Sequence, residues 1–121
     1  MVLGYKDTLR KKMDDFVHTV FDLAMNFPKD EIYITTAQLK RSALSVILNY
    51  TEGYARFKKK NQLNFLETAY VSLKEAKYLL YFSEKRKFIS HEQYTTVIDT
   101  VDQIGAMLWT EIIALSKSLD E

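Results

Sequence analysis

The sequence predicts an all-α protein, an up-down-up-down antiparallel four-helix bundle that forms a single domain over residues 1–121. Apolar residues recur at steps of three and four along most of the chain, which places them on one face of a helix. Only three glycines and one proline are present, too few for the turns of an all-β fold. The connections between the helical patterns are short, which favours antiparallel neighbours.

The composition is that of an ordinary globular domain. Apolar residues make up 47% of the chain and charged residues 27%, as in soluble rather than disordered proteins. There is no cysteine, which excludes disulfides and thiolate catalysis and fits a reducing cytoplasm. The early charges do not resemble a secretory signal, and no apolar run approaches the roughly 18 to 20 residues of a membrane span. We therefore expect a cytoplasmic protein with no membrane partner.

The first helix is expected to run from Tyr5 to about Asn26. Its core stripe repeats at intervals of four and three residues, with Leu9, Met13, Phe16, Val20 and Leu23 widened by Val17 and Ala24. Phe27-Pro28 ends the helix, because the residue before a proline is displaced from the α region. Residues 29–34 then form a connector.

The second helix is expected from Thr35 to about Phe57, with Thr35 and Gln38 as a capping box at its start. Its core face carries Ala43, Val46, Tyr50, Gly53 and Phe57. The opposite face is apolar again, with Leu44 and Leu48 one turn apart. A helix that is apolar on opposite faces is buried on more than one side. Leu44 and Leu48 are therefore candidates for an oligomer interface.

A polar stripe borders the core face of the second helix. A candidate polar network between this stripe and the third helix comprises Arg41, Asn49, Glu52, Arg56, Ser72 and Glu75. In an antiparallel hairpin, Glu75 falls level with Leu44 and can reach Arg41. Two interpretations stay open: contacts that fix the helix register, or a patch that binds a partner. Gly53 indicates either close approach of another backbone or simple tolerance of a glycine.

The third helix is expected from Asn61, as its N-cap, to about Lys87. Its core stripe consists of Leu66, Ala69, Leu73, Ala76 and Leu80. Ser90 and Gln93 form a second capping box and open the fourth helix. That helix carries a heptad-like seam of Tyr94, Val97, Val101, Ile104, Leu108, Ile112, Leu115 and Leu119. Off the seam lie Asp99, Asp102 and Glu111.

The formal net charge of +1 conceals an uneven distribution. Residues 58–87 carry eight basic and three acidic groups, whereas residues 88–121 carry one basic and six acidic groups. The topology brings one basic group of residues to one end of the bundle: Arg10, Lys11, Lys12, Arg56, Lys58, Lys59 and Lys60. These cations either keep a loop soluble or contact phosphates without reading sequence. Tyr54 and Phe57 nearby either stack on bases or belong to the core.

No catalytic or metal-binding pattern is present. Neither His18 nor His91 follows a glutamate by three residues, the spacing that di-iron bundles use. The sequence has no G-x-S-x-G turn and no glycine-rich phosphate loop. We therefore expect no enzyme activity, no metal, no cofactor and no small-molecule substrate.

The run from Arg41 to Glu75 resembles the four-helix-bundle proteins encoded in intervening sequences of bacterial 23S ribosomal RNA genes. The signature of that family reads approximately N-x-A-E-G-x-x-R, then S-K-K, then F-L-x-x-A-x-x-S-L-x-E. The matching positions are Asn49, Glu52, Gly53, Arg56, Lys59, Lys60, Phe65, Leu66, Ala69, Ser72, Leu73 and Glu75. Phe27-Pro28-Lys29 matches an F-P-K connector, and the resemblance covers about residues 9–115. Departures that leave the helical pattern intact occur at Ile47, Thr51 and Lys58.

The resemblance implies a fold and an assembly more than an activity. The family is related to the accessory variability protein of diversity-generating retroelements, a homopentameric bundle that binds nucleic acid and a reverse transcriptase. By this analogy we expect a homo-oligomer, a pentamer, acting as a non-enzymatic scaffold that binds RNA or an RNA-associated protein through its basic end. The alternative is a protein–protein adaptor, for example a reverse-transcriptase accessory, with no direct nucleic-acid contact.

Overall fold

Four long α-helices form the protein in the computed structural model, which describes residues 4–120. They are α1 (Tyr5–Ala24), α2 (Thr35–Ala55), α3 (Lys59–Lys85) and α4 (His91–Leu119), with a short 3₁₀ helix, η1 (Lys29–Glu31), between α1 and α2. Residues 4–120 contain no strand, which confirms the predicted all-α fold. Residues 1–3 and 121 of the predicted domain lie outside the described residues.

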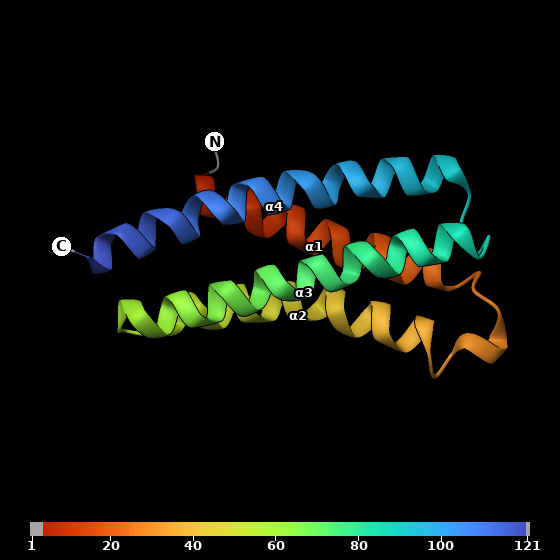
Figure 1. The fold of residues 1–121 in the computed structure, drawn as a ribbon, viewed down its shortest axis with the longest axis horizontal. Helices are drawn as coiled ribbons and strands as arrows, with labels where there is room; N and C mark the ends of the chain where they lie inside the picture. Colours follow the sequence, from red (N-terminus) through yellow and green to blue (C-terminus); the bar gives the residue numbers. More distant parts are fainter. Residues whose placement is uncertain (1–3, 121) are drawn as a thin grey trace.

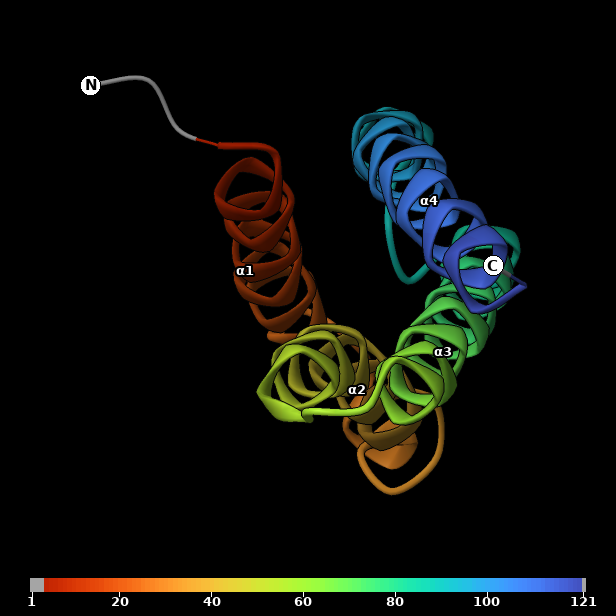
Figure 2. The same ribbon diagram turned by 90° about the vertical axis from the view of Figure 1, so that its left-hand side faces the viewer.

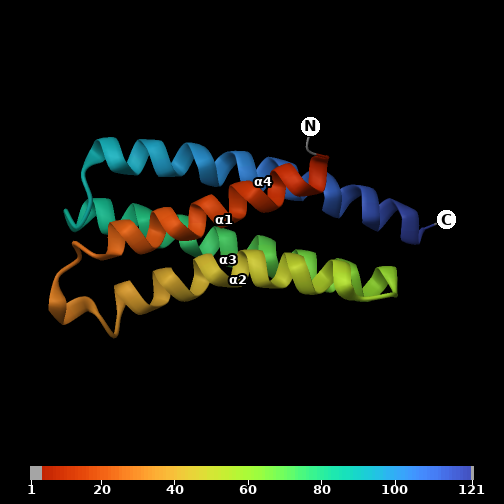
Figure 3. The same cartoon turned by 180° about the vertical axis from the view of Figure 1, so that it is seen from behind.

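The helices pack side by side, and the chain reverses its direction at each connection (Figure 1). Viewed from one end, α2 and α3 lie next to each other, with α1 beside α2 and α4 beside α3 (Figure 2). The view from behind shows that α1 begins short of the α2–α3 turn (Figure 3). The α2–α3 turn and the end of α4 therefore project together past the start of α1.

The core is filled by side chains from all four helices. Most residues of the predicted stripes are buried, including Leu9, Met13, Phe16, Val20, Ala43, Val46, Tyr50, Leu66, Ala69, Leu73, Ala76, Leu80, Ile104 and Leu108. Full burial of one large apolar side chain stabilises the fold by about 1.5–3 kcal/mol. Leu119 is 42% exposed, because the end of α4 extends beyond α1. Within residues 4–120, no helix combines the length and the apolarity that crossing a bilayer requires.

One of the two predicted capping boxes forms. At the start of α4 the Gln93 amide donates to Ser90 Oγ at 3.0 Å, and the Ser90 amide donates to Gln93 Oε1 at 2.9 Å. The box predicted at Thr35 and Gln38 is wrong, because the N-cap of α2 is Ile34 and makes no side-chain cap. Since η1 places Glu31 one turn earlier, the Thr35 hydroxyl donates to its carboxylate at 2.6 Å instead.

The α2–α3 turn is shorter than predicted. The second helix ends at Ala55 and α3 begins at Lys59, so Asn61 lies inside α3 and is not its N-cap. The N-cap is Lys58, whose backbone is extended (φ −87°, ψ 131°) and whose carbonyl accepts from the Gln62 amide at 3.0 Å. Three residues therefore connect the two helices.

Gly53 lies where α2 and α3 approach each other closely. A Cβ atom at this position would lie 3.1 Å from Phe65 Cβ and 3.3 Å from the Gln62 carbonyl oxygen. Both are nearer than carbon and oxygen atoms normally approach a side chain. Of the two explanations that the sequence left open for this glycine, the structure supports close backbone approach.

Candidate nucleic-acid interface

The α2–α3 turn and the first residues of α3 carry four cations and one aromatic residue at five consecutive positions. We call Arg56, Phe57, Lys58, Lys59 and Lys60 the basic tip. All five side chains are exposed. Within residues 4–120, the ion pairs at the tip are confined to Arg56, and Lys58–Lys60 have no carboxylate within 4.0 Å. The tip is therefore a concentrated positive surface at one end of the bundle.

The backbone of the tip is ordered by hydrogen bonds at both edges. The Arg56 amide donates to the Gly53 carbonyl at 3.1 Å, and Gln62 Nε2 donates to the Arg56 carbonyl at 2.8 Å. The Arg56 guanidinium contacts Glu52 Oε1 at 2.5 Å and lies over the Phe65 ring, 4.9 Å from its centre. Glu52 and Arg56, two members of the candidate polar network, thus form an ion pair within α2 and its C-cap, and the Glu52 carboxylate offsets part of the positive charge of Arg56.

The three cations of α1 have partners of their own. Arg10 lies 3.8 Å from Asp7, and its guanidinium lies over the Tyr50 ring. Lys11 pairs with Asp15 at 3.0 Å. The Lys12 ammonium donates to Gln103 of α4 at 2.9 Å. The structure brings together Arg56 and Lys58–Lys60 at the turn. Because α1 begins short of the turn, Arg10, Lys11 and Lys12 lie along the side of the bundle instead.

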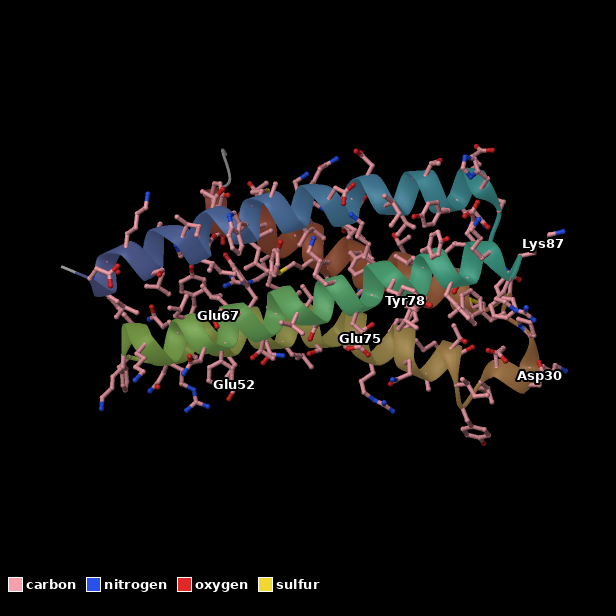
Figure 4. All side chains as sticks on the ribbon, in the orientation of Figure 1. Asp30, Glu52, Glu67, Glu75, Tyr78 and Lys87 are labelled. Carbon is pink, nitrogen blue, oxygen red and sulfur yellow. The ribbon has the colours of Figure 1, made fainter. Side chains whose placement is uncertain are left out.

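Part of the predicted polar network forms along the seam between α2 and α3. Ser45 Oγ and Ser72 Oγ lie 2.7 Å apart, and Asn49 donates to the Ser45 carbonyl and hydroxyl at 2.8 and 2.9 Å. Arg41 bonds to Gln38 at 2.6 Å, whereas the ion pair that we expected between Arg41 and Glu75 is not formed. Glu75 is exposed on α3 (Figure 4). The network therefore ties the two helices together at Ser45 and Ser72.

Two exposed apolar regions lie on different helices. Leu44 is 37% exposed and Leu48 61% exposed on the outer side of α2. Between α3 and α4, a groove of about 400 Å³ is lined mainly by Tyr70, Val71, Trp109 and Ile113. Tyr70 and Trp109 pack against each other with their ring centres 5.3 Å apart. Each region offers apolar surface to another molecule.

The sequence did not predict that one carboxylate near the basic tip is buried. Glu111 of α4 is 8% exposed and accepts hydrogen bonds from the hydroxyls of Tyr50, at 2.7 Å, and Tyr54. Burial, and then the bond to Glu111, raise the pKa of both tyrosines well above its usual value. Glu111 was expected off the seam, but it lies three residues after the core residue Leu108, a spacing that puts both side chains on one face of the helix and could have indicated burial.

The Glu111 carboxylate already accepts from two phenols, and it lies in a shallow pocket of about 330 Å³ whose rim includes Lys6 and Gln62. No group of three or more histidine, aspartate or glutamate side chains within residues 4–120 is arranged to hold a metal ion.

The family model of the 23S rRNA-intervening sequence protein matches residues 6–110. The chain belongs to this family. The fold is similar to the crystal structure of a protein of unknown function from the S23 ribosomal protein family of Bacteroides thetaiotaomicron, with a TM-score of 0.80. The two chains are 21% identical, and the similarity covers 86% of this chain and 97% of the other. No curated protein matches the chain.

The signature positions of this 23S rRNA-intervening sequence protein meet at the α2–α3 hairpin. Gly53 admits the backbone of α3, Glu52 holds Arg56, and Ser72 bonds across to Ser45. These contacts set the geometry of the hairpin that carries the basic tip.

Proposed function

We propose that the protein is a non-enzymatic, homo-oligomeric scaffold in the cytoplasm that binds RNA through its basic tip. The observation that carries the proposal is the exposure of Lys58, Lys59 and Lys60 side by side, with no carboxylate within 4.0 Å among residues 4–120. Ammonium groups that neutralise phosphates displace counterions, which provides affinity without sequence preference. Because the net charge of the whole chain is near zero, phosphates would bind at a local cluster of cations rather than over the whole surface.

The test is the salt dependence of RNA binding. Reversal of charge at Lys58, Lys59 and Lys60 together should weaken binding to a short RNA. It should also reduce the magnitude of the negative slope of log K against log [salt] by about 2. The matched control reverses Lys85, Arg86 and Lys87, a second run of three cations at the other end of α3, where Figure 4 shows Lys87. That control should bind like the unmodified protein. Undetectable binding of the unmodified protein at low salt would refute the proposal.

We propose further that copies of the chain associate through the outer face of α2, into a pentamer by analogy with the retroelement accessory protein. Leu48 is 61% exposed on a helix whose other face is in the core. The Leu48→Asp substitution should lower the mass measured by light scattering to that of a single chain without loss of helical circular dichroism. An unchanged mass would show that this face is not the interface.

An adaptor that binds protein rather than RNA is the second candidate. The groove between α3 and α4 favours it, because Tyr70 and Trp109 supply the aromatic surface that protein interfaces prefer. Under this candidate, a reverse transcriptase or another RNA-associated protein occupies the groove. Reversal of charge at the basic tip then leaves partner binding intact, whereas Trp109→Ala weakens it.

A further inference from the structure

Phe57 stands in the middle of the basic tip with its ring in water. Its side chain is as exposed as in an extended chain (102%), whereas phenylalanine is among the residues most often buried in folded proteins. Tight turns usually hold glycine, proline, asparagine, aspartate or serine. Packing within this chain therefore gives no reason for an aromatic ring at this position.

The backbone on both sides of Phe57 is fixed. The Arg56 carbonyl accepts from the Gln62 side chain at 2.8 Å, and the Lys58 carbonyl accepts from the Gln62 amide at 3.0 Å. Gln62 thus holds both neighbours of Phe57 through one residue of α3. A ring with two side-chain torsions on such a turn loses little conformational entropy when it binds.

The surroundings of the ring distinguish between classes of partner. In the sequence Arg56 precedes Phe57 and Lys58–Lys60 follow it, and charged residues are depleted at the core of protein interfaces. Helices that bind membrane surfaces lie in the plane of the membrane with a wide apolar face, whereas here one ring projects from the end of a hairpin. An aromatic face beside ammonium groups is the combination that binds single-stranded nucleic acids, because every base has a face to stack.

We propose that the basic tip binds single-stranded RNA, with Phe57 stacked on an unpaired base and the lysines contacting the adjacent phosphates. This inference rests on the RNA-binding function proposed above and adds the class of ligand. In an RNA duplex the base faces are covered by their neighbours, so the tip can contact only the backbone. The ring therefore distinguishes unpaired RNA from duplex RNA.

The experiment compares a fluorescein-labelled oligo(U) with an RNA duplex of equal phosphate number by fluorescence anisotropy at low salt. The Phe57→Ala substitution should weaken oligo(U) binding about tenfold, since stacking contributes about 1–3 kcal/mol per base. Duplex binding should change less than about twofold. Phe57→Leu, which keeps apolar bulk without an aromatic face, should weaken oligo(U) binding like Phe57→Ala, and Phe57→Trp should preserve it.

The matched control is Tyr33→Ala. Tyr33 is 91% exposed in the connector before α2, at the other end of the bundle, and its loss should change neither binding constant. A direct readout comes from Phe57→Trp in a Trp109→Phe background, where the single tryptophan lies at the tip. Oligo(U) should quench its fluorescence and the duplex should not.

Three results would overturn the inference. One is an unchanged oligo(U) affinity after Phe57→Ala while charge reversal of the lysines still weakens binding, which leaves the proposed function standing. Another is an equal loss for oligo(U) and duplex. The third is Phe57-dependent binding to phosphatidylserine vesicles that exceeds binding to oligo(U), which would assign the ring to a membrane surface. Failure of the unmodified protein to bind either RNA would refute the proposed function itself.

Discussion

The two helical glycines of the bundle should respond in opposite ways to the same substitution. Replacing a glycine in a helix by alanine stabilises the helix by about 1 kcal/mol, because the backbone loses less freedom on folding. At Gly53 the added Cβ would meet Phe65 Cβ at 3.1 Å and the Gln62 carbonyl at 3.3 Å. At Gly105 its nearest neighbour would be Leu73 Cδ2 at 3.5 Å, an ordinary contact.

The neighbours decide the size of each effect. The carbonyl and the Cβ near Gly53 belong to α3 and cannot turn away by changing a rotamer, so α2 and α3 must separate by a few tenths of an ångström. Such overpacking costs about 1–3 kcal/mol. Offset by the helical gain, Gly53→Ala should lower the free energy of unfolding by up to about 2 kcal/mol. Gly105→Ala should raise it by about 0.5–1 kcal/mol.

The assay is urea unfolding followed by circular dichroism, at one fixed protein concentration for all variants because association adds to apparent stability. The difference between the two variants matters more than either value, since both share the same helical gain. If Gly53→Ala stabilises the protein as much as Gly105→Ala does, the close approach of α2 and α3 at Gly53 is not limiting and the reasoning fails.

Three further substitutions test other parts of the fold. Leu73→Ala removes a core side chain that is 1% exposed and should cost about 2–5 kcal/mol in urea unfolding; a cost below about 1 kcal/mol would contradict its place in the core. Lys87 has a positive φ of 64° after α3, so Lys87→Gly should raise the free energy of unfolding by about 0.5–1 kcal/mol, and a loss would contradict this. Tyr50 keeps its proton in the folded state to a higher pH than in the unfolded chain, because burial and Glu111 raise its pKa. The contribution of this raised pKa to the free energy of unfolding is complete below about pH 10. Above that pH it declines by up to about 1.4 kcal/mol per pH unit. Stability measured from pH 9 to 11.5 should therefore fall less steeply in Tyr50→Phe, and equal slopes would refute the assignment.

The helices were predictable because burial follows the 3.6-residue period along each of them. Leu9, Phe16, Leu66, Leu80 and Leu108 are all buried, as their spacing predicted. The Ser90 capping box was also predictable, since its two hydrogen bonds involve residues three apart. Such features depend on the local chain alone.

The features that were missed depend on other parts of the chain. Thr35 has the same capping pattern as Ser90, but η1 brings Glu31 within 2.6 Å of its hydroxyl, and the sequence pattern contains no sign of this. Glu111 was expected off the seam, but it is buried, and the hydroxyls of Tyr50 and Tyr54 on another helix donate to its carboxylate. The assignment of Phe57 to the core face of the second helix is wrong, because α2 ends at Ala55 and leaves Phe57 exposed in the turn.

The buried carboxylate of Glu111 restricts how the helices can align. Seams built from leucine, isoleucine and valine look alike after a slide of seven residues, so an apolar core alone permits several alignments of α4 along its neighbours α1 and α3. In a slid alignment Glu111 would lose the hydroxyls of Tyr50 and Tyr54, and a buried acceptor left without its partners costs about 1–3 kcal/mol, or more when it is charged. The same three side chains therefore select one alignment, and with it the level at which α4 ends beside the α2–α3 turn.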